Sequence, residues 1–186
     1  YSRFGDEEVL DLVNIKSDSL KLNQVRVEVH AVGLNPIDYK TFEGAKPLRF
    51  LSFMTKLRKP SRWFESKSSL FPRGVGRDFA GVITEIGEGV SRFAVGDKVF
   101  GTMISDPGLR TKRGALATEV CVNESEIVLK PEMIDMNHAA TMGVASLTVG
   151  GAFRKIELNS KDVVVISAAA GGIGSIAVQY AVAKGS

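Results

Sequence analysis

Short runs of alternating apolar and polar residues fill the chain up to about residue 135, and they predict β-strands. In residues 24–34, Val25, Val27 and Val29 alternate with polar side chains, as in a strand with one buried face. Similar strand and turn patterns recur in residues 80–89, 95–101 and 115–131. This spacing predicts a small, partly open β-barrel.

The pattern changes near residue 135. Residues 137–153 are rich in Ala, Met and Leu and predict a helix. Residues 162–167 form a continuous β-branched run, typical of a parallel strand that is buried on both faces. Residues 176–184 predict a helix packed on a sheet, with Gly185 as its C-cap. The whole chain is therefore expected to be α/β.

A run of small residues separates the predicted buried strand from the following helix. Residues 163–183 carry no charge, but two adjacent glycines, serines and Gln179 argue against a membrane span. The run fits G-x-G-x-x-G with alanine first, between a strand and a helix, as in a dinucleotide-binding turn. The alternative is simple close packing of small side chains. The residues of the candidate turn are Ala169, Ala170, Gly171, Gly172, Ile173 and Gly174.

The cysteine content limits the classes of site. The single cysteine, Cys121, excludes an internal disulfide and a multi-cysteine zinc site. The residues before the predicted strands do not have the pattern of a secretory signal, so secretion is not expected. A cytoplasmic location is expected, with an organelle as the alternative because a cleaved leader leaves no trace.

Positive charge is concentrated in one segment. Residues 46–77 contain nine basic side chains and one acid, Glu65, whereas the net charge of the chain is only +3. The protein is therefore not expected to bind nucleic acid through a uniformly basic surface. Residues 50–58 have helical apolar spacing and predict either a surface helix that weakly contacts an anionic membrane or a partner, or a solvated lid-like loop.

Several stretches together resemble the medium-chain dehydrogenase/reductase superfamily, in its zinc-free quinone oxidoreductase (ζ-crystallin-like) branch. The resemblance implies a GroES-like catalytic domain over residues 1–135, with a basic insert at 46–75. It also implies the start of a nucleotide-binding Rossmann domain, a doubly wound parallel sheet, over 136–186. The stretches are 26-RVEVHAVGLNPIDYKTFEG-44, 76-GRDFAGVITEIGEGVSRFAVGDKVFG-101, 114-GALATEVCV-122, 139-AATMGVASLTV-149 and 163-VVVISAAAGGIG-174.

The resemblance implies chemistry without a metal. Zinc-dependent members have a cysteine where this chain has Asn35, and a histidine-glutamate pair where it has Arg77 and Asp78. The implied reaction is hydride transfer to a quinone or an α,β-unsaturated carbonyl compound. The expected cofactor is NADPH, with NADH as the alternative.

The resemblance also implies the site residues. Tyr39 is a candidate proton donor and Asn35 a second catalytic candidate. The alternatives are a packed tyrosine, an asparagine that shapes the turn before proline, and a helix-capping role for Asp38. The implied cofactor-binding residues are Asn35, Pro36, Ile37 and Asp38 near the nicotinamide, Thr148 near its ribose and phosphate, and Ala169 to Gly174 at the pyrophosphate.

The family pattern continues beyond Ser186, so the chain is expected to be a fragment. The full-length protein is expected to be a homodimer, by resemblance. A rival hypothesis is a non-catalytic GroES-like binding or adaptor protein that acts through the basic insert.

Overall fold

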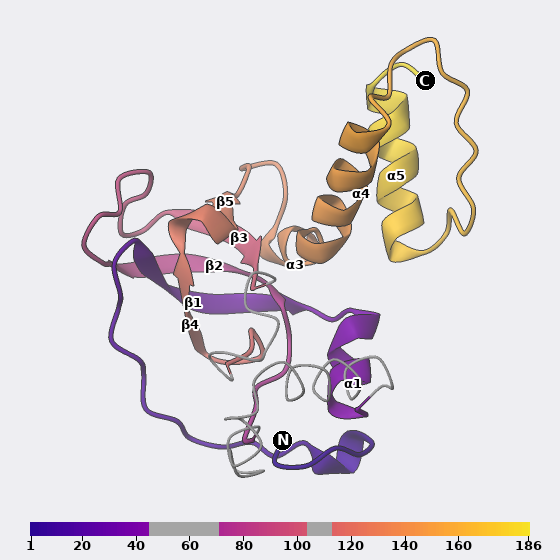
Figure 1. Ribbon diagram of the computed structural model, residues 1–186. Coiled ribbons are helices and arrows are strands. Elements are labelled where there is room, and N and C mark those ends of the chain that lie inside the picture. The colour runs from indigo at the N-terminus through magenta and orange to yellow at the C-terminus, as the bar shows by residue number, and fades with distance from the viewer. Residues whose placement is uncertain (45–70, 104–112) are drawn as a thin grey trace, which may run out of the picture.

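The computed structural model describes residues 1–44, 71–103 and 113–186 (Figure 1). Strands dominate the first part of the chain and helices the last, and this mixture confirms the expected α/β class. The elements are η1 (Glu7–Val9), β1 (Gln24–Gly33), α1 (Pro36–Phe42), β2 (Asp78–Ile86), β3 (Lys98–Thr102), β4 (Glu119–Asn123), η4 (Glu124–Glu126), β5 (Ile127–Leu129), α3 (Met136–Ala140), α4 (Gly143–Lys155) and α5 (Gly172–Ala183).

The strands form one antiparallel sheet in the order β4-β1-β2-β3-β5. β1 pairs with both β2 and β4, and the predicted alternation along it is confirmed because Val25 and Val27 are fully buried while Glu28 and His30 are exposed. The sheet is open, with β4 and β5 at its edges. Its core consists of Val25, Val27, Phe79, Ile83, Phe93, Val99, Met103, Ala115, Val120, Val122 and Ile127.

The helical region at the C-terminal end has its own small core. The predicted helix over 137–153 is two helices, α3 and α4, divided after Ala140. α4 packs beside α5 (Figure 1), and the rings of Phe153 and Tyr180 stack with centroids 5.2 Å apart. The C-cap of α5 is Lys184, one residue before the predicted Gly185. Gly185 follows it with φ +83°, the left-handed conformation common after a helix, and its N–H donates to the Val182 carbonyl over 3.0 Å. None of the described helices is long and apolar enough to cross a membrane.

The prediction of a buried strand over 162–167 is wrong in this structure. The segment is irregular and has no sheet partner among the described residues. Val163 and Val165 are 95% and 93% exposed, whereas Val164 and Ile166 pack against α4 and α5. A parallel strand needs neighbouring strands to pair with and helices on both of its faces. Here the helices cover only one face, so half of the β-branched run is exposed.

β1 and β2 approach each other closely at Gly81, and this contact predicts the effect of adding one methyl group there. A Cβ at position 81 would lie 1.9 Å from the carbonyl oxygen of Glu28. We expect Gly81→Ala to lower the free energy of unfolding by about 1–3 kcal/mol, because the two strands must separate locally. Urea denaturation measures the change.

Gly150→Ala is the matched control. Position 150 lies inside α4, and a Cβ there meets nothing within 4 Å. This substitution is expected to raise stability by about 0.5–1 kcal/mol, since alanine loses less backbone entropy in a helix than glycine. Equal effects of the two substitutions would contradict the packing described.

Candidate active site

The N-terminal end of α1 is held by hydrogen bonds within its own first turn. Asn35 has the extended backbone (φ −121°, ψ 157°) favoured before a proline, and Pro36 occupies the first helical position. The side chain of Asp38 accepts a hydrogen bond from the Asn35 N–H over 2.7 Å. The turn-shaping role of Asn35 and the capping role of Asp38 are therefore both present.

A second, fully buried carboxylate joins α1 to α4. Asp78, the first residue of β2, has no exposed surface, and its Oδ2 accepts from the Asn35 Nδ2 over 2.9 Å. Both oxygens of Asp78 lie 3.0 Å from the N–H of Val144 in the first turn of α4. The positive end of the helix dipole favours a carboxylate here. A Cβ at Gly143 would lie 2.4 Å from Asp78 Oδ1, so this close approach requires glycine.

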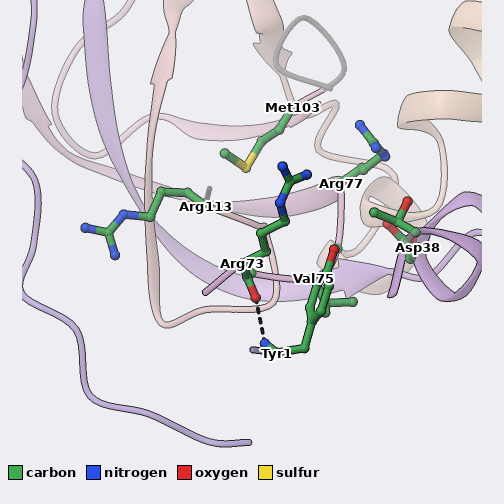
Figure 2. A pocket seen from close by; sticks show the side chains of 10 residues that line it. Tyr1, Asp38, Arg73, Val75, Arg77, Met103 and Arg113 are labelled. Atoms are coloured by element: carbon green, nitrogen blue, oxygen red, sulfur yellow. Dashed lines mark hydrogen bonds between the residues drawn. The ribbon is translucent and has the colours of Figure 1, made fainter. Parts of the chain in front are cut away.

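A small pocket lies beside Asp38, and Tyr1 at the start of the chain also lines it (Figure 2). Arg73, Arg77 and Arg113 contribute to its lining, but they are not equivalent. Figure 2 shows the Arg113 guanidinium turned away from Asp38, and it forms an ion pair with Asp18 over 2.8 Å. Arg73 and Arg77, from the end of the basic segment, are half-buried here. Residues 46–70 of that segment lie outside the described residues.

Burial alters the acidity of Asp38. The side chain is 6% exposed, and its removal from water raises the pKa of the carboxyl group. The hydrogen bond from the Asn35 backbone and the charge of Arg77 act in the opposite direction, whereas the nearby Asp78 raises this pKa further. Asp38 is thus a carboxyl group that is costly to ionise, although it caps a helix.

The other predicted residues of this region are more exposed. Tyr39 is 45% exposed, so it is not a fully packed tyrosine. Ile37 is half-buried and Pro36 is exposed. Thr148 lies on an exposed position of α4, where its hydroxyl donates to the Val144 carbonyl over 2.7 Å. The hydrogen bonds join Asn35, Asp38 and Asp78 into one cluster and link Thr148 to it through Val144.

The predicted small-residue turn leads into α5. Residues 167–173 are exposed, and Gly171 is the N-cap without a side-chain hydrogen bond to the helix. The first backbone N–H groups of a helix have no acceptor within it. Added atoms at Gly172 would meet nothing within 4 Å, whereas a Cβ at Gly174 would lie 2.2 Å from the Ala168 carbonyl oxygen. The turn is open at its start and closely packed at its end, as a phosphate-binding turn requires.

One residue of the cluster was not predicted to have a structural role. In the sequence, Asp78 stands out only as a departure from the zinc-binding pattern. Its partners are 43 and 66 residues away in the sequence. The only local signal is Met142, the N-cap residue of α4, because a methionine side chain cannot cap a helix by accepting from its N–H groups. The N–H groups at the start of α4 therefore need an acceptor from elsewhere in the fold.

Residues 21–132 match the family model of the alcohol dehydrogenase GroES-like domain. The chain belongs to this family. The match covers the five strands and the cluster residues Asn35, Asp38 and Asp78. The GroES-like part of the predicted fold is therefore confirmed. The division into domains at residue 135 stays a prediction.

Relatives of this GroES-like chain include oxidoreductases. It is 30% identical over 184 residues to the NADPH-dependent alkenal/one oxidoreductase of Arabidopsis thaliana chloroplasts, covering 97% of this chain and 43% of that protein. The quinone oxidoreductase of Coxiella burnetii has a TM-score of 0.77 at 33% identity, covering all of this chain and 52% of that one. The Escherichia coli quinone oxidoreductase complexed with NADPH has a TM-score of 0.70 at 26% identity, covering all of this chain and 49% of that one. The predicted resemblance to the quinone oxidoreductase branch is confirmed.

The chain spans about half the length of the curated relatives it matches. What those proteins bind and reduce therefore belongs to a proposal about the full-length protein.

The raised pKa of Asp38 predicts a pH-dependent effect of Asp38→Asn. The amide keeps an oxygen that can accept from the Asn35 N–H. Between the ordinary carboxyl pKa and the raised one, native Asp38 binds more protons than unfolded Asp38, so its contribution to stability falls as pH rises. The free energy of unfolding of the variant, relative to the unsubstituted protein, should rise through this window and then level off. Urea denaturation at a series of pH values measures it.

Asp135→Asn supplies the opposite control. Hydrogen bonding from the His138 backbone lowers the pKa of Asp135, so this carboxylate stabilises the fold above its ordinary pKa. The Asp135 variant should lose stability relative to the unsubstituted protein as pH rises. A parallel response of the two variants would contradict the burial argument for Asp38.

Proposed function

We propose that the full-length protein uses NADPH to reduce a quinone or an α,β-unsaturated carbonyl compound. The observation that carries the proposal is the exposed, uncapped turn at the start of α5, in a chain that aligns along its whole length with a quinone oxidoreductase complexed with NADPH. The name of the Arabidopsis relative supports the same cofactor and a conjugated carbonyl substrate. The expected cytoplasmic location stays a prediction, since that relative is described as chloroplastic.

The chain offers a suitable cradle for the cofactor phosphates. The exposed backbone of Ala169 to Gly174 and the positive end of the α5 dipole suit a pyrophosphate. Gly172 leaves the approach open, and Gly174 keeps the turn close to the preceding segment. Thr148 is exposed on the neighbouring helix α4, where it could contact the ribose or phosphate of the nicotinamide half.

The nicotinamide end is assigned to the start of α1, at Asn35, Pro36, Ile37 and Asp38. When bound, NADPH supplies a hydride from C4 of its nicotinamide ring. Asn35 and Asp38 hold the start of α1 rigidly, which suits the orientation of a flat ring. Tyr39 is the candidate proton donor to the substrate oxygen, since it lies on the same helix and is partly open to solvent.

The proposed reaction does not use zinc. The side chain at position 35, where zinc-dependent members have a cysteine, is a neutral amide whose nitrogen donates to Asp78. Thiolate, imidazole and carboxylate groups are the ligands that zinc prefers. The described residues contain no group of three or more such side chains that could hold a metal. Activation of the substrate oxygen therefore falls to a hydrogen-bond donor.

The activity is tested directly on the full-length protein. Loss of nicotinamide absorbance should require both NADPH and an acceptor, a quinone or an enone, and should survive treatment with a zinc chelator. No acceptor-dependent loss of absorbance would overturn the proposal.

Gly174→Val tests the cofactor turn. The new side chain begins 2.2 Å from the Ala168 carbonyl and must displace the turn. We expect NADPH affinity to fall by about tenfold or more, the scale of one lost hydrogen bond to a charged group. Fluorescence titration with NADPH measures it. Gln179→Ala, at an exposed position further along α5, is the control and should leave the affinity unchanged.

A further inference from the structure

We infer that Asp78 is a positioning residue that fixes which way the side-chain amide of Asn35 faces the bound cofactor. The inference rests on the proposed function, because it concerns the nicotinamide end of the same site. It assigns to Asp78 a role beyond holding α4 in place.

The orientation follows from hydrogen-bond chemistry. An asparagine side chain has a donor end and an acceptor end, which an environment without preference would not distinguish. Asp78 Oδ2 accepts from Asn35 Nδ2 over 2.9 Å, and both carboxyl oxygens also accept from the Val144 N–H. The amide nitrogen must therefore face Asp78, and the Oδ1 of Asn35 must face away from it.

Asp78 itself has little freedom to move. It is completely buried, and its two oxygens share the N–H of Val144. Gly143 approaches the carboxylate so closely that even a methyl group would not fit between them. A buried carboxylate with few donors must keep each of them, since a lost partner in a site shielded from water is costly.

The backbone of Asn35 is equally restricted. Its N–H is bound by Asp38, and the following proline limits its conformation. With both ends of the contact fixed, the direction of the Asn35 Oδ1 is fixed as well. In the capping box this side chain accepts from the Asp38 backbone N–H, and an amide oxygen has a second lone pair with which it can accept from a ligand. The group it recognises must donate a hydrogen bond. The nicotinamide half of NADPH has such donors in its carboxamide and its ribose hydroxyls.

The test is a double-mutant cycle in the full-length protein, with Asp78→Asn, Asn35→Ala and the double variant. An asparagine at position 78 can still accept from Val144, so the start of α4 keeps its partner. It can also donate, so it no longer dictates the orientation of Asn35. The measured quantity is the dissociation constant for NADPH from fluorescence titration. The kcat and the KM for the acceptor are measured alongside it.

Each single variant is expected to weaken NADPH binding roughly tenfold, the scale of one hydrogen bond. If Asp78 acts through Asn35, the double variant should also be weakened only about tenfold, because the second change removes nothing further. A loss near a hundredfold in the double variant would show independent effects and overturn the inference. The KM for the acceptor should change less than the NADPH affinity.

Thr102→Val is the control for disturbance of the same packed region. Thr102 pairs with Asp78 across β2 and β3, and its buried hydroxyl has no hydrogen-bond partner among the described residues. Valine has nearly the same shape, so NADPH affinity should be unchanged. A tenfold loss in this variant as well would mean that any repacking near Asp78 weakens binding, and the positioning role would fall.

Failure of the two proposals can be told apart. If the unsubstituted full-length protein does not bind NADPH, both are overturned. If it binds NADPH and oxidises it with an acceptor, but the cycle is additive, the inference about Asp78 is wrong while the proposed function stands.

Discussion

The buried carboxylate of Asp78 is the contact on which the arrangement of the candidate site depends. A carboxylate without access to water needs donors around it, and the fold supplies them from two separate helices. Asn35 comes from the start of α1 and Val144 from the start of α4, so one side chain at the end of a sheet strand holds both helix starts. The glycine at position 143 allows this contact, because any larger residue would push α4 away from the sheet.

This arrangement explains how a GroES-like sheet can support a site at one of its ends. The residues proposed for the nicotinamide end lie at the first turn of α1, and the open turn of α5 lies on the helix that packs beside α4. Asp78 ties the first of these regions to α4, so the two proposed parts of the cofactor site are linked through packed secondary structure. Asn35 and Asp78, two of the positions at which the chain departs from the pattern of zinc-dependent members, are joined by a hydrogen bond.

Features encoded by local patterns were predicted from the sequence. The alternation around Val25 and Val27 indicated β1, and Gly185 marked the end of α5, because both signals depend on residues close in the chain. The role of Asp78 could not be predicted in this way, since its partners are 43 and 66 residues distant. The run at 162–167 has the composition of a buried strand, but pairing depends on neighbouring strands, and the described residues give it none. The small-residue turn was predicted from its motif and the residues near the nicotinamide from the resemblance, whereas the hydrogen-bond network required the structure.

The central claim, hydride transfer from NADPH to a conjugated carbonyl compound, is tested most directly by isotope transfer. The full-length protein would be incubated with an enone and NADPH carrying deuterium on one face of the nicotinamide C4, and the product analysed by mass spectrometry. A site that fixes the ring in one orientation should deliver deuterium to the β-carbon from one of the two labelled forms and hydrogen from the other. A reduced product without deuterium from either form, or no reduced product, would contradict the account.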